Sequence, residues 1–129
     1  LYGHEIACYH TKLDHIKMPD KSRFESANGF YATIFHELGH WTGHTKRLNR
    51  KELNALSFFN STSYSQEELC AELTSVFVCS GLGISSESTL RNSAVYLAGW
   101  LKYLKDNPKA FVYACQQAGH ASDFINNNK

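Results

Sequence analysis

The feature that most constrains this 129-residue chain is a histidine pair, His36 and His40, inside a stretch with helical periodicity. Apolar residues recur there at spacings of four, three, four and three, which predicts an amphipathic helix from about residue 26 to residue 42, ended by Gly43. The apolar positions are Ala27, Tyr31, Ile34, Leu38 and Trp41. On a helix, residues four apart project about 40° from one another, so both imidazoles can reach one metal ion. Since the apolar positions fall mainly opposite the histidines, we expect the helix to pack through its apolar face and to present the histidines to a cleft.

Glu37 lies between the two histidines, about 100° around the helix from His36. This position is beside a bound metal rather than on it. Zinc with three protein ligands keeps a position open for water and lowers the pKa of that water to about 7. A neighbouring carboxylate can then accept the proton of the attacking water and return it to the leaving amine. The motif therefore predicts a Zn²⁺ site with His36 and His40 as ligands and Glu37 as the catalytic base.

The third metal ligand is less constrained. Metzincins place a histidine six residues after the second one, but Lys46 occupies that position and His44 comes two residues early. We therefore expect His44 to cap the helix or to face the substrate rather than to bind the metal.

A carboxylate from a second helix is the other solution. This helix is predicted from Ser65 to about residue 82, with Ser65 and Glu68 as a capping box. It offers Glu67, Glu68 and Glu72 as ligands. Glu68 and Glu72 share a face, so if Glu68 binds the metal, Glu72 can orient one of the histidines. The residues alone leave all three glutamates open.

The remaining pattern predicts few strands and more helices. Residues 6–18 alternate weakly around a break at 11–14, which indicates a β-hairpin. Residues 44–63 indicate a long loop with one helical turn, anchored by Phe58 and Phe59. A third helix is expected over about 90–105, with a leucine stripe. A fourth begins at Pro108, capped by Asn107, and carries an apolar face. The stripe is Leu90, Leu97, Leu101 and Leu104, and the face is Phe111, Cys115, Ala118, Ser122 and Ile125.

Three further features have functional alternatives. Tyr96, Trp100 and Tyr103 form an aromatic stripe, which we expect to pack in the core, and Tyr96 is the member placed to donate a hydrogen bond to a tetrahedral oxyanion. His120 is expected at the surface. Residues 16–18 are a candidate sheet edge for an extended peptide.

Composition is that of one globular domain spanning residues 1–129, with 43% hydrophobic and 19% charged residues. A net charge of +1 does not favour nucleic acid as a partner of this domain, and no apolar run approaches a membrane span. The four cysteines form no Cys-x-x-Cys pair, and Cys70 and Cys79 lie on different faces of one predicted helix. We therefore expect free thiols and a cytoplasmic location. Because the chain begins at Leu1, we expect it to be part of a longer protein.

Several segments together resemble the metallopeptidase domain of ArdC-type antirestriction proteins, the polyvalent-protein metallopeptidase group found on plasmids, phages and other mobile elements. They are residues 36–44, 47–50, 67–73 and 96–101, with the early Met18-Pro19, and the similarity covers nearly the whole chain. The resemblance implies an α+β, zincin-like fold, mostly helical, with a small N-terminal hairpin. It also relates the Glu68-to-Ala71 stretch to the glutamate helix of IrrE-type peptidases, which favours Glu68 as the third ligand.

Two functions follow as expectations. The first is a zinc metallopeptidase of the gluzincin type that cleaves a protein or peptide substrate in an antirestriction setting. The second is a non-catalytic module that is stabilised by its metal and blocks a host factor. Glu37 distinguishes them, because a purely structural zinc needs no general base.

Overall fold

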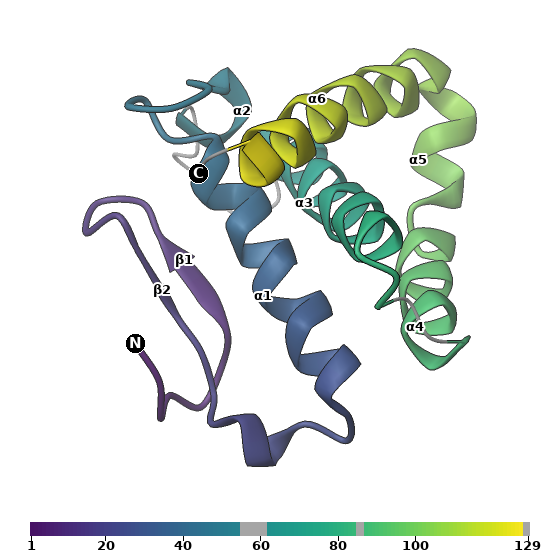
Figure 1. Ribbon diagram of the computed structural model, residues 1–129. Coiled ribbons are helices and arrows are strands. Elements are labelled where there is room, and N and C mark those ends of the chain that lie inside the picture. The colour runs from purple at the N-terminus through teal and green to yellow at the C-terminus, as the bar shows by residue number, and fades with distance from the viewer. Residues whose placement is uncertain (55–61, 85–86, 128–129) are drawn as a thin grey trace.

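The computed structural model describes residues 1–54, 62–84 and 87–127. A short antiparallel hairpin is followed by a 3-10 turn at Lys21–Arg23 and by helices (Figure 1). The elements are β1 (Cys8–His10), β2 (His15–Lys17), α1 (Ala27–Thr42), α2 (Lys51–Asn54), α3 (Thr62–Gly81), α4 (Glu87–Ala98), α5 (Leu101–Asp106) and α6 (Pro108–Asn127). The α+β, mostly helical fold predicted from the sequence is confirmed.

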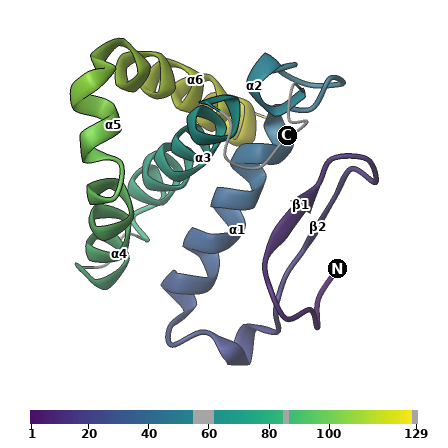
Figure 2. The ribbon, with the colours of Figure 1, turned by 180° about the vertical axis from the view of Figure 1, so that it is seen from behind.

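Helix α1 forms the centre of the molecule and begins where the sequence predicts. The Ser26 side chain accepts a hydrogen bond from the Gly29 amide at 3.0 Å, which satisfies one of the free amides of the first turn. The hairpin lies along one side of α1, and α3 and α6 lie on the other (Figures 1 and 2). The hairpin pairs Tyr9 with Ile16, as the alternation predicts.

The face through which α1 packs differs from the prediction. Helix α3 packs against the side of α1 that carries the histidines, and Glu37, Gly39 and His40 are buried. Within the predicted apolar stripe, Ala27 and Tyr31 are exposed and the other three positions are only half-buried. The prediction of an apolar packed face opposite open histidines was therefore wrong. Polar side chains can be buried at this contact because they are paired with one another across it.

Gly39 explains how closely α1 and α3 approach. A Cβ atom at this position would lie 2.9 Å from the Cα atom of Ala71 and 3.2 Å from the Cβ atom of Thr74. The first distance is shorter than real Cβ contacts, and the second is tighter than most of them. Glycine therefore sets the spacing that brings the carboxylates of α3 to the histidines of α1.

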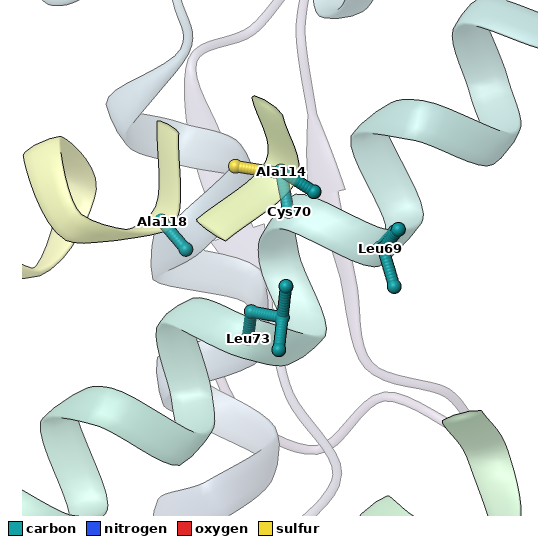
Figure 3. Packing of buried hydrophobic residues seen from close by; sticks show 5 residues of the cluster. All are labelled: Leu69, Cys70, Leu73, Ala114 and Ala118. Atoms are coloured by element: carbon teal, nitrogen blue, oxygen red, sulfur yellow. The ribbon is translucent and has the colours of Figure 1, made fainter. Parts of the chain in front are cut away.

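The hydrophobic core lies between α3 and α6. Leu69, Cys70 and Leu73 from α3 meet Ala114 and Ala118 from α6 (Figure 3). The buried face of α6 consists of small residues, so the two helices pack closely. The face predicted for α6 is confirmed in part: Ala118 and Ser122 are buried, but Phe111 is exposed, and Ala114 and Ala121 are fully buried.

Two helix predictions need correction. Helix α3 begins at Thr62, one turn before Ser65, so Ser65 and Glu68 do not form a capping box at its start. The helix predicted over 90–105 is two helices, α4 and α5, separated at Gly99 and Trp100. Glycine weakens a helix interior, and the leucine stripe is divided accordingly: Leu97 and Leu104 pack against the core, but Leu90 and Leu101 are exposed. The fourth helix starts at Pro108 as predicted. Helix α2 supplies the helical turn expected after α1. Phe58 and Phe59 lie outside the described residues.

The sheet edge proposed for a docking peptide is already in use. The Ile16 carbonyl accepts a hydrogen bond from the Leu1 amino group at 3.2 Å, and the Met18 amide donates to the Leu1 carbonyl at 2.9 Å. The Met18 carbonyl also accepts from the His4 amide. Residues 16–18 are therefore not a free edge, and this prediction was wrong.

All four cysteines are free thiols, with Cys70 and Cys79 buried. Among the described residues, no helix combines the length and hydropathy needed to cross a bilayer.

Candidate metal centre

Helices α1 and α3 bring His36, His40 and Glu68 to one point. The Nε2 atom of His40 lies 3.2 Å from Oε1 of Glu68, and the Nε2 atom of His36 lies 3.5 Å from Oε2 of the same carboxylate. One ligand atom from each residue lies within 4.8 Å of the other two. Two neutral imidazole nitrogens and a carboxylate oxygen are the donors of many catalytic zinc sites, so the side chains fit a divalent metal ion.

The opposite nitrogens of the two imidazoles are held by the other two glutamates. Nδ1 of His36 lies 3.0 Å from Oε2 of Glu72, and Nδ1 of His40 lies 3.1 Å from Oε1 of Glu67. A carboxylate on Nδ1 fixes the orientation of the ring and keeps the proton on that nitrogen, which leaves Nε2 as the donor to a metal. Of the three glutamates left open by the sequence, Glu68 is thus on the Nε2 side, whereas Glu67 and Glu72 are on the Nδ1 side.

The carboxylate of Glu67 also forms an ion pair with a buried arginine. Arg50 donates to Oε2 of Glu67 at 2.9 Å and to Oε1 at 2.6 Å, and both side chains are almost completely buried. The same guanidinium donates to the Gly39 carbonyl at 2.6 Å and to Oγ1 of Thr42 at 2.8 Å. Arg50 therefore connects the loop after α1 to both helices of the site.

The electrostatics of the site follow from this pairing. Burial alone lowers the pKa of His36, but its hydrogen bonds to Glu68 and Glu72 outweigh burial and raise the pKa to about 10. Burial likewise lowers the pKa of His40, and the hydrogen bonds to Glu67 and Glu68 reverse the direction and raise it. Burial raises the pKa of Glu68, but both histidines together hold it well below its usual range. A metal ion that binds here replaces imidazole protons, so binding releases protons to the solvent.

Glu37 and Tyr96 lie at the same centre. Glu37 follows His36 on α1 and is buried. The hydroxyl of Tyr96 donates to Oε2 of Glu68 at 2.9 Å, and its ring meets the His36 ring edge-on at a centroid distance of 6.3 Å. Burial and the Glu68 carboxylate both raise the pKa of Tyr96, so its hydroxyl stays protonated at neutral pH and remains a donor. The aromatic stripe continues from Tyr96 to Trp100 and Tyr103, with ring centroids 6.3 Å and 6.1 Å apart.

The other histidines considered in the sequence do not join this group. His44 lies in the turn after α1, where its Nδ1 accepts a hydrogen bond from the Lys46 amide at 3.2 Å. Its role is thus in the loop that follows the helix. His120 is exposed on α6.

Two residues of the site were not identified from the sequence. Arg50 falls in a basic loop that looks solvent-exposed on composition alone, and only its position in the 47–50 segment of the family resemblance marked it. Tyr64, one turn before Glu68 on α3, hydrogen-bonds to Glu68. The sequence signal for that contact is the spacing of four residues between them on one helix.

Comparison with known proteins identifies the family and the fold. A family model described as zincin-like metallopeptidase matches residues 1–117. The chain is similar to the crystal structures of the antirestriction ArdC protein from plasmid R388, at 38% identity over 98% of this chain. The TM-score is 0.77 for the Mn(II)-bound form and 0.75 for the metal-free form. The resemblance read from the sequence is confirmed.

Curated relatives include the DNA primase TraC of Escherichia coli, 39% identical over 95% of this chain, and the uncharacterized protein y4eC of Sinorhizobium fredii, 33% identical over 96%. All of these proteins are longer. The chain spans 11% of that primase, 39% of y4eC and 45% of the Mn(II)-bound ArdC chain.

Proposed function

Because the chain belongs to the zincin-like metallopeptidase family, we propose that it hydrolyses peptide bonds with His36, His40 and Glu68 as ligands of a zinc ion. The observation that carries this proposal is the arrangement of the three side chains: their donor atoms converge, while Glu72 and Glu67 back the histidines from behind. An inert structural site needs convergence but no adjacent base. Here Glu37 is next to the first ligand in the chain.

The residues divide the chemistry between them. When bound, zinc acts as a Lewis acid and lowers the pKa of water to about 7. Glu37 accepts a proton from the water molecule as the oxygen atom of that water bonds to the peptide carbonyl carbon. The same carboxyl group then gives the proton to the amide nitrogen as the C–N bond breaks, which yields a carboxylic acid and an amine; the acid then loses its remaining proton to the solvent. Tyr96 donates a hydrogen bond to the oxygen that becomes negative during the attack.

The setting that we propose is antirestriction by a mobile element, with a host protein as the substrate. Its support is the similarity to ArdC, a protein described as antirestriction. The rival function is a metal-stabilised module that blocks a host factor without cleaving it. Convergent ligands are compatible with both functions, so the test must address Glu37.

The experiment compares wild type with Glu37→Gln, both loaded with zinc, on a mixed peptide library read by mass spectrometry. Glutamine keeps the size of the side chain but cannot accept the proton, so we expect full metal content and at least about a 100-fold loss of hydrolysis. Glu25→Gln, at an exposed position outside the site, is the matched control and should cleave like wild type. Wild-type hydrolysis by Glu37→Gln contradicts the assigned base. If wild type cleaves nothing and Glu37→Gln still protects incoming DNA from restriction in cells, the rival function stands.

A further inference from the structure

A pocket of about 310 Å³ opens beside the candidate metal centre, between the first half of α1, the middle of α3 and helix α4. Three residues of the centre, His36, Glu72 and Tyr96, form one wall. The pocket therefore borders the candidate metal centre on the side of Glu72 and Tyr96, and Tyr96 in turn contacts Glu68. Gly29 and Ala32 leave room on the α1 side because they carry almost no side chain.

Three hydroxyl groups of the pocket donate their protons to other groups of the protein. Thr33 donates its proton to the Gly29 carbonyl at 3.0 Å, and Ser75 donates to the Ala32 carbonyl at 2.7 Å. Ser93 hydrogen-bonds to the carboxylate of Glu72, for which it is the donor. A hydroxyl has one proton to give and two lone pairs. These three groups consequently offer lone pairs to a ligand, and their protons are already used within the protein.

When a metal ion holds His36 as a neutral imidazole, the charge of the lining has one sign. Glu72 supplies a carboxylate, and among the described residues that line the pocket none is lysine or arginine. Asn92, exposed on α4, supplies an amide. A side chain that ends in several N–H donors and a positive charge matches such a surface, whereas a carboxylate ligand meets lone pairs and a like charge.

We propose that this pocket binds a lysine or arginine side chain of the substrate, next to the bond that is cleaved. The proposal rests on the proposed function and gives it a substrate class: peptides or protein segments with a basic residue at the cleavage site. An aliphatic side chain of the same length loses the hydrogen bonds and leaves the lone pairs unpaired. Selectivity should therefore favour the basic residue by about 10-fold.

Affinity for small chelating probes tests the pocket independently of hydrolysis. The hydroxamates of lysine, norleucine and glutamate share a metal-binding group and differ at the end of the side chain. Titrated calorimetrically into the zinc-loaded protein, lysine hydroxamate should bind about 10-fold more tightly than norleucine hydroxamate, and glutamate hydroxamate most weakly. Equal affinity for the lysine and norleucine compounds, or none for either, overturns the proposal.

A second experiment places a positive charge on a residue that lines the pocket. Asn92→Lys adds a cation to the lining and should remove the preference for lysine hydroxamate, while norleucine hydroxamate binds within about twofold of wild type. Ala94→Lys is the matched control, because it adds the same charge at another exposed position of α4 outside the lining. A preference for lysine that survives Asn92→Lys, or that is lost equally in Ala94→Lys, contradicts recognition by this pocket.

The peptide library separates this proposal from the proposed function. Cleavage with lysine or arginine enriched beside the scissile bond supports both. Cleavage without any such enrichment leaves the hydrolysis standing and overturns the pocket assignment. Selective binding of lysine hydroxamate without any cleavage supports the pocket and contradicts the hydrolase.

Discussion

At the scale of single residues, Arg50 contributes to the candidate site without being one of the proposed metal ligands. Its guanidinium neutralises Glu67, which holds Nδ1 of His40, and it also binds the backbone of α1 at Gly39. A buried carboxylate that loses its cationic partner is costly because nothing else compensates its charge. Arg50 is thus a positioning residue for His40, acting through Glu67.

Replacing Arg50 with methionine tests this role. Methionine fills a similar volume but leaves the Glu67 charge unpaired, so we expect the free energy of unfolding to fall by about 3–5 kcal/mol. Zinc affinity should fall as well, because His40 loses a fixed partner. Urea denaturation and a competitive zinc titration measure the two effects.

The control is Arg91→Met on α4. Arg91 pairs with Glu87 at 2.9 Å, but both side chains are largely exposed, so this substitution should change the free energy of unfolding by less than about 1 kcal/mol. An Arg50→Met protein as stable as Arg91→Met shows that the buried pair does not hold the site.

The sequence predicted only the local part of this site. His36 and His40 share a helix face because of their spacing, and spacing is visible in the chain. Which glutamate faces the Nε2 atoms of the histidines, and which ones hold the Nδ1 atoms, depends on how α3 is rotated against α1. No local sequence pattern specifies this rotation for Glu67, Glu68 and Glu72. Arg50 was missed for the same reason, since its carboxylate partner, Glu67, lies 17 residues away in the chain.

At the scale of elements, the contact between α1 and α3 depends on Gly39. We expect Gly39→Ala to separate the helices, because the added methyl group would meet the backbone of Ala71 rather than a flexible side chain. The free energy of unfolding should drop by about 1–3 kcal/mol, as for other overpacked cores. Thermal denaturation followed by circular dichroism measures the loss.

Gly119→Ala is the matched substitution within α6. An added Cβ atom at Gly119 meets nothing within 4 Å, so alanine should stabilise the helix by up to about 1 kcal/mol. If both alanine variants shift stability in the same direction, close approach is not the reason for glycine at position 39.

The hairpin is attached to the end of α1 by an ion pair. Arg47 donates to both carboxylate oxygens of Asp14, and its guanidinium stacks over the Trp41 ring with its central carbon 3.9 Å from the centroid. Asp14 has a φ of 50°, a conformation that asparagine also tolerates. The hydrogen bond from Arg47 is the main reason that the pKa of Asp14 is lowered to about 2.

The pH dependence of Asp14→Asn follows from that shift. A carboxyl group whose pKa is lower in the folded state stabilises the fold above its unfolded pKa, near 3.9, and this contribution disappears as the pH falls through about 2. Wild type should therefore be more stable than Asp14→Asn at pH 5 and above, and the difference should vanish near pH 2. Urea midpoints from pH 2 to pH 6 test this.

Asp123→Asn, on the exposed side of α6, is the control and should stay within about 0.5 kcal/mol of wild type across the series. A gap between wild type and Asp14→Asn that persists at pH 2 contradicts the ion pair as its source.

Most helices and strands were predictable from the sequence, but their exact ends and their buried faces were less predictable. The start of α1 carries a capping residue, Ser26, and α6 begins at Pro108, and both signals act within a few positions. The face of α6 was only partly predicted because the core selects small residues, Ala114 and Ala121, where hydrophobicity alone favours Phe111. Burial of the histidine face of α1 was missed because polar pairing across two helices has no signature in either one.

At the scale of the whole molecule, the metal centre and the core share α3. One side of this helix carries Glu67, Glu68 and Glu72 towards α1, and another carries Leu69, Cys70 and Leu73 to α6. A metal ion that binds only the folded chain must therefore stabilise the entire fold rather than one loop.

Zinc at 100 times its dissociation constant should raise the free energy of unfolding by about 2.7 kcal/mol, which corresponds to roughly 10 °C in Tm. Differential scanning fluorimetry with and without zinc measures the shift, and a chelator should reverse it. His120→Ala, which removes an exposed histidine, should retain the shift, and His36→Ala should lose it. A shift that persists in His36→Ala places the bound ion elsewhere.

The many contacts of α3 also restrict which substitutions such a domain can accept during evolution. Positions 69, 70, 71, 73, 74 and 75 are buried, and positions 67, 68 and 72 contact the histidines, so the middle of α3 has almost no neutral position. Descendants of this chain should therefore accumulate substitutions on α4, whose exposed residues include Leu90 and Val95, and adapt to new substrates through its pocket-facing side. The helices of the candidate metal centre, α1 and α3, can then remain fixed while the residues that line the pocket change.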